Sequence, residues 1–387
     1  MISPYPFKPR GRLLDVMRQV GDPGLINLAA GLPSVHCVPK ADLTAAFLAT
    51  LEENADEALG YHVPDGDLRL RQLLVDRFHR RGINTSVDQM VITTGCSQAL
   101  HGMIRLLAKP GDIVACEAPA YYSTLEIMGD LGLKALPVPV KDIDGIDFEL
   151  AQVLFRRYQP KLFAICSSLS NPSGATIPSE IRKALIELCR ETGTRILEDD
   201  IYGELSEISD LKPIRAFDDG STVSYVTSFS KTVAPGLRIG VCLPGLDANP
   251  FALLKCQQDM HSATLCEVAF RRYFETGRLD GHLEYLRRFN QERRELALSV
   301  IEECFPASAT VWKPAGGFLL WVELPPGIKA EQVYRSALKE KVAFCPGSAF
   351  YTSDENEIGA MRLNCSRPSE QELVKGLRIL GRIVKQA

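Results

Sequence analysis

The chain has 387 residues, a formal net charge of −4 and a pI near 6.0. Hydrophobic residues make up 45% and charged residues 24%, a balance that excludes a disordered chain and provides for a buried core. The acidic balance argues against a nucleic-acid-binding protein, and no apolar run reaches the ~18 residues of a membrane span. Residues 1–6 lack the features of a signal peptide, so we expect a cytoplasmic protein that acts on small molecules.

The length predicts two or three compact units rather than one small core. We expect a large domain over residues 46–270, and a second unit that combines an N-terminal segment, 1–45, with a small C-terminal domain, 271–387. The eleven cysteines are scattered singly, without a C-x-x-C pair or a histidine at zinc spacing. We therefore predict no metal site and expect most cysteines to be buried in a reducing compartment.

Short apolar runs alternate with helical patterns from about Gln89 to Ser228, which is typical of a mostly parallel sheet covered by helices on both faces. The expected strands are 90–93, 113–116, 161–166, 195–198 and 223–227. Ligands of open α/β sheets bind at the carboxyl ends of the strands. The residues that follow these runs are therefore the first candidates for a functional site.

The first two strands are followed by a possible phosphate site and a possible stacking aromatic. Cys96 and Ser97 open a helix expected over 99–107, where free backbone N–H groups bind phosphate, although such a turn is equally often a plain N-cap. Tyr121, after the second strand, is placed to stack on a flat ring or simply to pack a loop.

The next two strands are followed by an amide and by acidic groups. Asn171 begins an Asn-Pro-x-Gly turn and can donate to a cofactor oxygen, but a plain Asx-turn explains it almost as well. Asp199 is the first residue of the motif Asp-Asp-Ile-Tyr, which ends at Tyr202. Its carboxylate would keep a pyridinium nitrogen protonated, or else cap a helix or pair with an arginine.

The fifth strand leads directly into Ser228-Phe229-Ser230-Lys231, with Arg238 seven residues further on. A lysine at the end of a buried strand tends to lose its proton and becomes a nucleophile for Schiff-base chemistry. Two hydroxyls and a guanidinium nearby would hold a phosphate dianion. The combination suggests pyridoxal 5'-phosphate, with a solvated loop as the alternative interpretation.

The rest of the chain has a mixed α+β pattern. A charged helix is expected over 281–302, a turn entering a strand over 314–321, and a strand over 361–364. That last strand carries Arg362, whose planar fork suits an amino-acid or oxo-acid carboxylate, or else an internal acidic partner.

The order of these motifs resembles the fold-type I pyridoxal-phosphate enzymes, and specifically the class I/II aminotransferases, from about residue 30 to 364. Residues 228–238 are most similar to the branch that holds aminoadipate and kynurenine aminotransferases and the aminotransferase-like domains of MocR-type regulators. The resemblance implies an α/β large domain with a mostly parallel, seven-stranded-type sheet and helices on both faces. It also implies a smaller α+β domain.

The resemblance implies a role for each candidate residue. Lys231 would be the Schiff-base lysine and proton shuttle, and Asp199 the pyridinium partner. Tyr121 would stack on the face of the cofactor ring, and Asn171 and Tyr202 would bond its phenolic oxygen. The cofactor phosphate would be held by Cys96, Ser97, Ser228, Ser230 and Arg238. Arg362, helped by Asn171 and the backbone near Gly31, would bind the substrate carboxylate. Tyr61 would reach the phosphate of a partner subunit, which implies a homodimer with shared active sites.

Several positions depart from the family's pattern in regions that contact substrate. These positions are Cys96, 169–170, 36–39 and 266–267. Elimination, replacement or carbon–carbon bond formation with the same cofactor therefore stands beside transamination as an alternative. A regulator's effector domain without turnover is the third reading, and few residues precede Gly31 here. Arg12 could meet a distal substrate group, although a solvated arginine explains it as well.

Overall fold

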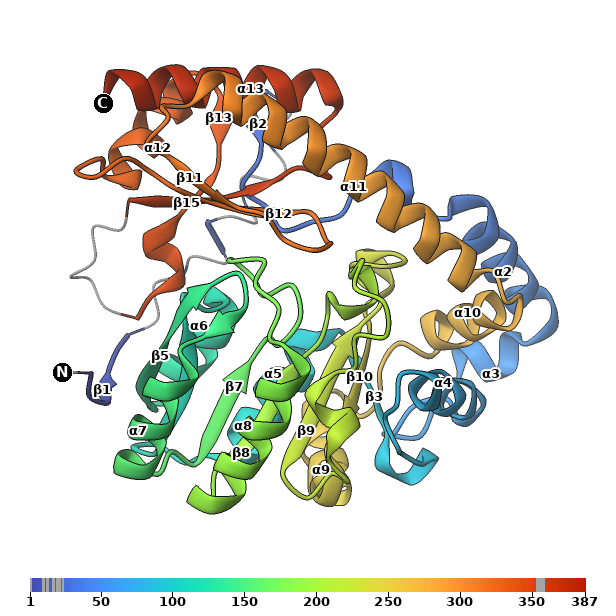
Figure 1. Ribbon diagram of the computed structural model, residues 1–387. Coiled ribbons are helices and arrows are strands. Elements are labelled where there is room, and N and C mark those ends of the chain that lie inside the picture. Colours follow the sequence, from blue (N-terminus) through green and yellow to red (C-terminus); the bar gives the residue numbers. More distant parts are fainter. Residues whose placement is uncertain are drawn as a thin grey trace.

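The computed structural model describes residues 2–8, 11, 14–15, 18, 22, 24–352 and 359–387. It contains a large sheet with helices packed on it and a smaller sheet above it, both visible in Figure 1. In these residues, no helix combines the length and the apolar character needed to cross a bilayer. Apart from one short N-terminal strand, the large sheet and its helices come from the middle of the chain, whereas the smaller sheet comes from its last third.

The large sheet has nine strands among the described residues, and seven of them have four or more residues. Their order is β1-β5-β4-β7-β8-β9-β10-β3, and the short β6 pairs with β5. The bounds are β1 Tyr5–Pro6, β3 Val91–Thr94, β4 Ile113–Ala118, β5 Lys134–Asp142, β6 Gly145–Ile146, β7 Leu162–Ile165, β8 Arg195–Asp199, β9 Val223–Ser228 and β10 Ile239–Leu243. Neighbours from β5 to β9 are parallel, and β10 is antiparallel to both β9 and β3. The predicted mostly parallel, seven-stranded-type sheet is confirmed.

The sheet also contains two long strands that the sequence pattern did not indicate, β5 and β10. Pro137 and Pro139 lie within β5 and argue against a strand, because proline cannot donate to a ladder. They are tolerated because β1 pairs only with Lys134 and Ala135 of β5. Neither proline therefore has to donate a hydrogen bond to β1. Of the five predicted strands, all form, with ends shifted by one to two residues.

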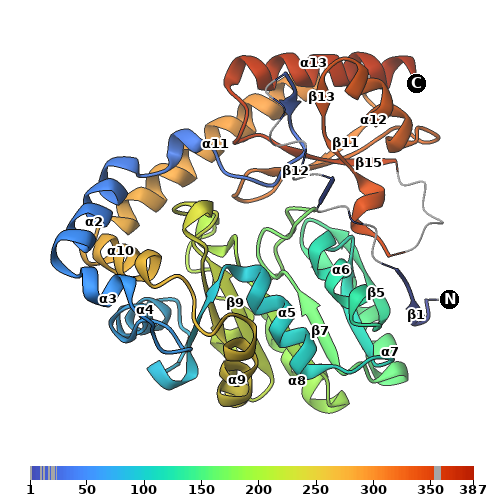
Figure 2. The same ribbon diagram turned by 180° about the vertical axis from the view of Figure 1, so that it is seen from behind.

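Helices cover both faces of the large sheet, and the alternation of strand side chains explains why. On one face, α5 (Cys96–Leu107), α6 (Tyr122–Asp130) and α9 (Ala248–Asp259) pack on Val114 and Leu197. On the other face, α7 (Phe148–Tyr158) and α8 (Ser179–Thr192) pack on Ala115 and Ile196. Neighbouring residues of one strand thus enter different cores. Figure 2 shows α5 and α9 on the near side of the sheet, seen from behind.

The smaller unit is an antiparallel sheet, β11-β12-β15-β14, with a parallel pair β2-β13 beside it. The strands are β2 Ile26–Asn27, β11 Thr310–Trp312, β12 Leu319–Glu323, β13 Val342–Ala343, β14 Cys345–Pro346 and β15 Ala360–Asn364. Its helices are α11 (Leu279–Cys304), α12 (Ala330–Lys339) and α13 (Glu370–Gln386). The predicted charged helix and the strand that carries Arg362 both form. Because β2 pairs with β13, an N-terminal segment is part of the C-terminal unit.

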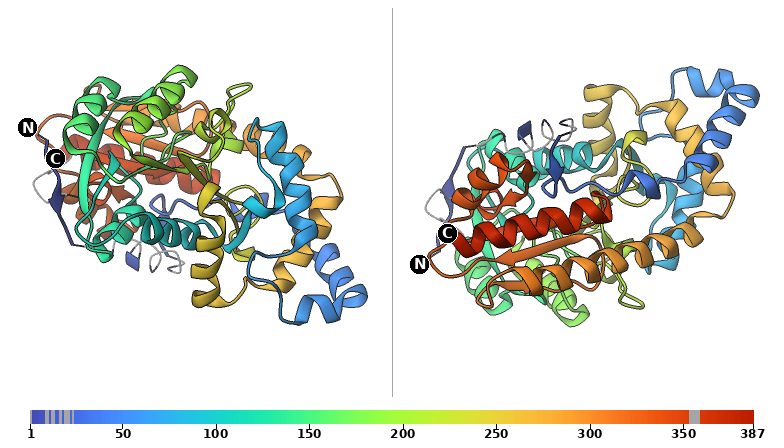
Figure 3. Two further views of the ribbon diagram at one scale, coloured as in Figure 1. Left: turned by 90° about the horizontal axis from the view of Figure 1, so that it is seen from below. Right: turned by 90° about the horizontal axis from the view of Figure 1, so that it is seen from above.

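Four further helices lie to one side of the large sheet: α2 (Lys40–Glu53), α3 (Ala55–Leu59), α4 (Leu68–Arg80) and α10 (Thr264–Glu275). Figure 3 shows them at one end of the molecule, with α11 and α13 side by side across the top. One continuous core runs through this group and the small sheet, and it includes Leu70, Phe270 and Leu377. The two sheets are therefore held together by shared packing and not by a single linker.

Candidate active site

A cavity of about 530 Å³ lies where strands of the large sheet end. Its lining comes from the segments that follow β3, β4, β7, β8 and β9, and from the backbone of residues 30–32. The lining residues are Ala30, Gly31, Leu32, Cys96, Ser97, Leu100, Tyr121, Tyr122, Cys166, Asn171, Asp199, Ile201, Tyr202, Ser230, Lys231, Pro235, Gly236 and Arg238. The cavity thus lies at the strand ends, where the sequence predicts the site.

Lys231 lies three residues after the end of β9, and its side chain reaches into the cavity. Its Nζ donates to the Gly31 carbonyl oxygen at 2.6 Å. Burial, followed by the positive charge of Arg362, lowers the pKa of Lys231 to about 8, against the opposing carboxylate of Asp199. A substantial fraction of this amine is neutral near physiological pH, which is the form that attacks a carbonyl.

Asp199 ends β8 and is buried beside the cavity. Its Oδ1 accepts a weak hydrogen bond from Cys96 Sγ at 3.5 Å and one from the backbone N–H of Ile201 at 3.3 Å. Burial raises the pKa of the Asp199 carboxyl to about 7, although these two donors oppose the shift. A protonated ring nitrogen placed in the cavity would compensate the buried negative charge, so this carboxylate fits a pyridinium.

Ser228, Ser230 and Arg238 form a hydroxyl and guanidinium cluster at the start of α5. Ser230 N–H donates to Ser228 Oγ at 3.0 Å, and Arg238 Nη1 lies 3.4 Å from Ser230 Oγ. Gly95, with φ +76°, precedes α5, and a Cβ there would collide with the Arg238 guanidinium. The guanidinium therefore lies directly against the free N–H groups of this helix, a donor set suited to a phosphate dianion.

Arg362 lies on β15 and is fully buried. It is not a lining residue of the cavity but lies behind the lining residues Asn171 and Gly31. Its Nη1 donates to Asn171 Oδ1 at 2.7 Å, and its Nη2 donates to the Ala29 carbonyl oxygen. The guanidinium carbon lies 5.6 Å from the Tyr122 ring centroid and 4.9 Å from that of Phe350. Among the described residues no Asp or Glu forms an ion pair with it, so the part of the chain that the structure describes offers no acidic partner for this arginine.

The aromatic candidates divide into two inside the cavity and one outside. Tyr121 and Tyr202 line it, and Tyr121 packs against Tyr122 with ring centroids 4.9 Å apart. Tyr61 is 86% exposed and touches His261 edge-on, so it contributes nothing to the cavity of its own chain.

Several lining residues were not singled out from the sequence, including Tyr122, Cys166 and Ile201. Each adjoins a residue that was named or ends a predicted strand, so position after a strand was the available signal. Arg12 lies outside the described residues.

The cavity and its surroundings bring together a lysine, a buried carboxylate, a hydroxyl and guanidinium cluster and a buried arginine. Such a set of groups suits a phosphorylated carbonyl cofactor. Residues 23–380 match the family "Aminotransferase class I and II". The chain belongs to this family, and it is a pyridoxal-phosphate-dependent transferase that moves an amino group between an α-amino acid and a 2-oxo acid. The resemblance inferred from the motif order is thereby confirmed.

Three relatives place the chain within this family. It is 30% identical to 2-aminoadipate transaminase of Thermus thermophilus, over 96% of this chain and 93% of that one. It is 28% identical to an uncharacterised HTH-type transcriptional regulator of Escherichia coli, over 97% of this chain and 80% of the regulator. A crystal structure of kynurenine aminotransferase from Pyrococcus horikoshii, in complex with PMP, superposes with a TM-score of 0.92 at 31% identity and covers 97% and 95% of the two chains.

Proposed function

We propose that this cavity is the active site, and that the residues around it divide into a cofactor-holding set and a substrate-holding set. The observation that carries the proposal is that Lys231, Asp199 and Arg238 line one cavity. Arg362 lies behind the lining and donates to the lining residue Asn171. These residues would thus supply a covalent anchor, a pyridinium partner and a phosphate partner around one cavity.

The cofactor-holding residues would act through the contacts that the structure describes. Lys231 would bind the cofactor covalently, and Asp199 would keep the ring nitrogen protonated. The ring would lie against Tyr121, with Asn171 and Tyr202 placed to bond its phenolic oxygen. Its phosphate would accept hydrogen bonds from the cluster at the start of α5, which consists of Cys96, Ser97, Ser228, Ser230 and Arg238.

When bound, pyridoxal phosphate supplies a ring that withdraws electrons from the substrate's α-carbon. Asp199 supports this by maintaining the positive charge on the ring nitrogen. Lys231, once released from the cofactor, would hold and move the α-proton, because its pKa of about 8 is close to the operating pH. The buried walls exclude water from these proton transfers.

The substrate-holding residues would be Arg362, Asn171 and the backbone at Gly31. A carboxylate bound by the fork of Arg362 would fix the orientation of the amino acid, and hence which α-carbon bond is broken. A Cβ at Gly31 would lie 3.7 Å from both Arg362 Nη1 and Tyr202 Oη, so a side chain there would narrow this end of the cavity.

We further propose a homodimer in which Tyr61 contributes to the partner's active site. The exposure of Tyr61 and of its neighbours Leu59 and Val63, 67% and 48% exposed, supports this. Mixing a Tyr61→Ala chain with a Lys231→Ala chain should restore about a quarter to a half of the wild-type activity per dimer, because one site in each hybrid is intact. Two inactive variants that stay inactive on mixing, in a protein shown to be dimeric, would contradict the shared site.

The domain bounds at 45 and 270 and the cytoplasmic location stay predictions.

The deciding experiment is the absorbance spectrum of the purified protein with bound cofactor, before and after a panel of amino acids led by glutamate, aminoadipate, methionine and aromatic ones. We expect the band of the covalently bound cofactor to disappear with at least one donor, with formation of the matching 2-oxo acid. Consumption of a donor without 2-oxo acid would favour elimination or replacement. A protein that binds no added cofactor would overturn the assignment of Lys231.

A further inference from the structure

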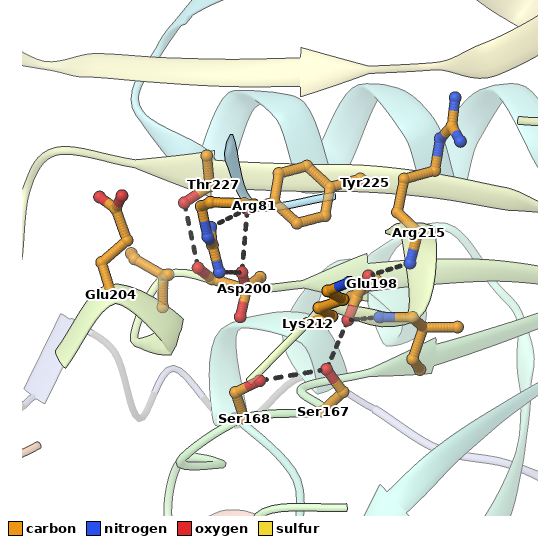
Figure 4. A network of polar contacts seen from close by, with 12 residues as sticks. Arg81, Ser167, Ser168, Glu198, Asp200, Glu204, Lys212, Arg215, Tyr225 and Thr227 are labelled. Carbon is orange, nitrogen blue, oxygen red and sulfur yellow. Dashed lines mark hydrogen bonds and ion pairs between the residues drawn. The ribbon is translucent and has the colours of Figure 1, made fainter. Parts of the chain in front are cut away.

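A second layer of charged side chains lies on the face of β8 that is turned away from the cavity. Side chains of a strand alternate, so Asp199 faces α5 and the cavity, while Glu198 and Asp200 face the other side. Asp200 is fully buried there, next in sequence to the proposed pyridinium partner. Figure 4 shows this layer, with Asp200 in contact with both Arg81 and Thr227.

The Arg81 cluster consists of Arg81, Asp200 and Tyr225. Asp200 Oδ2 accepts from Arg81 Nη2 at 2.6 Å and from Tyr225 Oη at 2.9 Å. Arg81 Nη1 donates to the same Tyr225 oxygen at 2.8 Å, which closes the triangle. Arg81 directly follows α4, so the cluster connects that helix to both strands next to the site.

Two further bonds, made by the Asp200 backbone, fix the end of β8 against β9. The backbone N–H of Asp200 donates to the Val226 carbonyl oxygen at 2.9 Å, and Thr227 Oγ1 donates to the Asp200 carbonyl oxygen at 3.0 Å. Because β9 leads directly to Lys231, these bonds set the position of Asp199 relative to the reactive lysine. Gly203 encloses the carboxylate, since a Cβ there would collide with Asp200 Oδ1.

Arg81 is the group that directly balances the charge of Asp200. The other titratable groups that act on the cluster are Glu198 on the same strand, Glu204 after it and Arg182 on α8. On the cavity side, Cys96 and Lys231 act on Asp199. The further titratable groups that interact with it there are Glu117, Tyr121, Cys166 and Tyr202. Asp200 Oδ1 has no hydrogen-bond partner among the described residues. The hydrogen bonds to Oδ2, from Arg81 and Tyr225, therefore stabilise the negative charge of this carboxylate. The negative charge of Asp200 raises the pKa of Asp199, and its neutralisation therefore affects the site.

We propose that the Arg81 cluster is a positioning device for transamination, which holds Asp199 in place and keeps it ionised opposite the cofactor nitrogen. Arg81, Asp200 and Tyr225 touch neither substrate nor cofactor and act through Asp199. This inference rests on the role proposed above for Asp199.

Charge removal from the two sides of the cluster has opposite consequences. Replacing Arg81 by methionine leaves the negative charge of Asp200 uncompensated, which raises the pKa of Asp199. Replacing Asp200 by asparagine leaves the positive charge of Arg81, which lowers the pKa of Asp199. If the cluster were purely structural, the two substitutions would not shift the pKa of Asp199 in opposite directions, because each would only destabilise the fold.

The test measures the pH profile of kcat/KM for Arg81→Met, Asp200→Asn and the double variant, each with bound cofactor and with the best donor of the amino-acid panel. We expect the acidic limb to move up by about one pH unit in Arg81→Met and down by about one unit in Asp200→Asn. The double variant should return close to the wild-type profile, and Arg81→Lys should resemble wild type. Tyr225→Phe, which removes one hydroxyl, should shift the limb upward by less.

A matched control is Arg190→Met, because Arg190 on α8 pairs with the buried Asp218 at 3.0 Å, near the start of β9 and away from the cavity. We expect it to lower stability without moving the pH profile. Single variants that shift the limb in the same direction, or not at all, would overturn the inference while transamination by the wild type stands. If Arg81→Met does not fold, Asp200→Asn and Tyr225→Phe decide the question. A wild type without turnover would instead overturn the proposed function.

Discussion

The cavity has two walls of different origin. The wall with Lys231, Asp199 and Arg238 comes from neighbouring strands of one parallel sheet. The opposite wall, with Gly31 in the lining and Arg362 behind it, comes from an N-terminal segment and from β15 of the small sheet. The first wall is fixed by one continuous hydrogen-bonded sheet, whereas the second depends on packing between two units.

The difference indicates a division of work. Groups that must stay attached to a cofactor through every turnover lie on the rigid sheet. Groups that meet each new substrate lie on the wall that two sheets complete together. Substitutions on the first wall should therefore change cofactor binding, and substitutions on the second should change substrate binding.

The largest effect is expected for Lys231→Ala on the sheet wall. Loss of the covalent anchor and of the proton carrier should lower kcat by on the order of 10⁴-fold or more. Turnover and the cofactor spectrum measure this, with the exposed Lys183→Ala as the control. Full exchange at the wild-type rate would disprove the role of Lys231.

Arg362→Leu should raise KM for the amino acid by about 10²-fold, because two charge-assisted hydrogen bonds to a carboxylate are lost. The affinity for the cofactor should change little, which steady-state kinetics and cofactor dialysis can separate. Arg362→Lys, with charge but no fork, should lie between. Release of the cofactor from Arg362→Leu at unchanged KM would reverse the assignment of the two walls.

Ser230→Ala should lower the affinity for the cofactor by about tenfold, because one hydrogen bond from a hydroxyl to the charged phosphate is lost. Its KM for the amino acid, measured at saturating cofactor, should stay at the wild-type value. Ser221→Ala, in the exposed loop before β9, is the matched control. An unchanged cofactor dissociation constant would show that the phosphate lies elsewhere.

The smallest effect concerns pH and connects the two walls. Covalent uptake of pyridoxal phosphate by cofactor-free protein needs the neutral amine of Lys231, whose pKa of about 8 is lowered by burial and by Arg362. The uptake rate should rise by about tenfold per pH unit below that pKa and level off above it. Arg362→Leu should move this profile to higher pH. A profile that rises steadily past pH ~10 would contradict a lowered pKa.

The sequence predicted the sheet wall well and the rest of the architecture less completely. Five strands and the residues after them follow from local alternation and turn chemistry, which neighbouring residues determine. Strand β5 was missed because it contains two prolines, which are normally excluded from the middle of a sheet. Its place near the sheet edge makes them acceptable. The exposed position of Tyr61 gives no local signal at all.

By itself the sequence determined the order of the chemical groups, because each follows a strand whose end the local pattern marks. Tertiary structure alone decided that Arg362 meets the backbone near Gly31 and that Arg81 reaches Asp200 behind the site. These contacts join segments far apart in the chain. Their pairing follows from how two sheets and a helix pack, and burial then makes each pairing necessary by penalising an uncompensated charge.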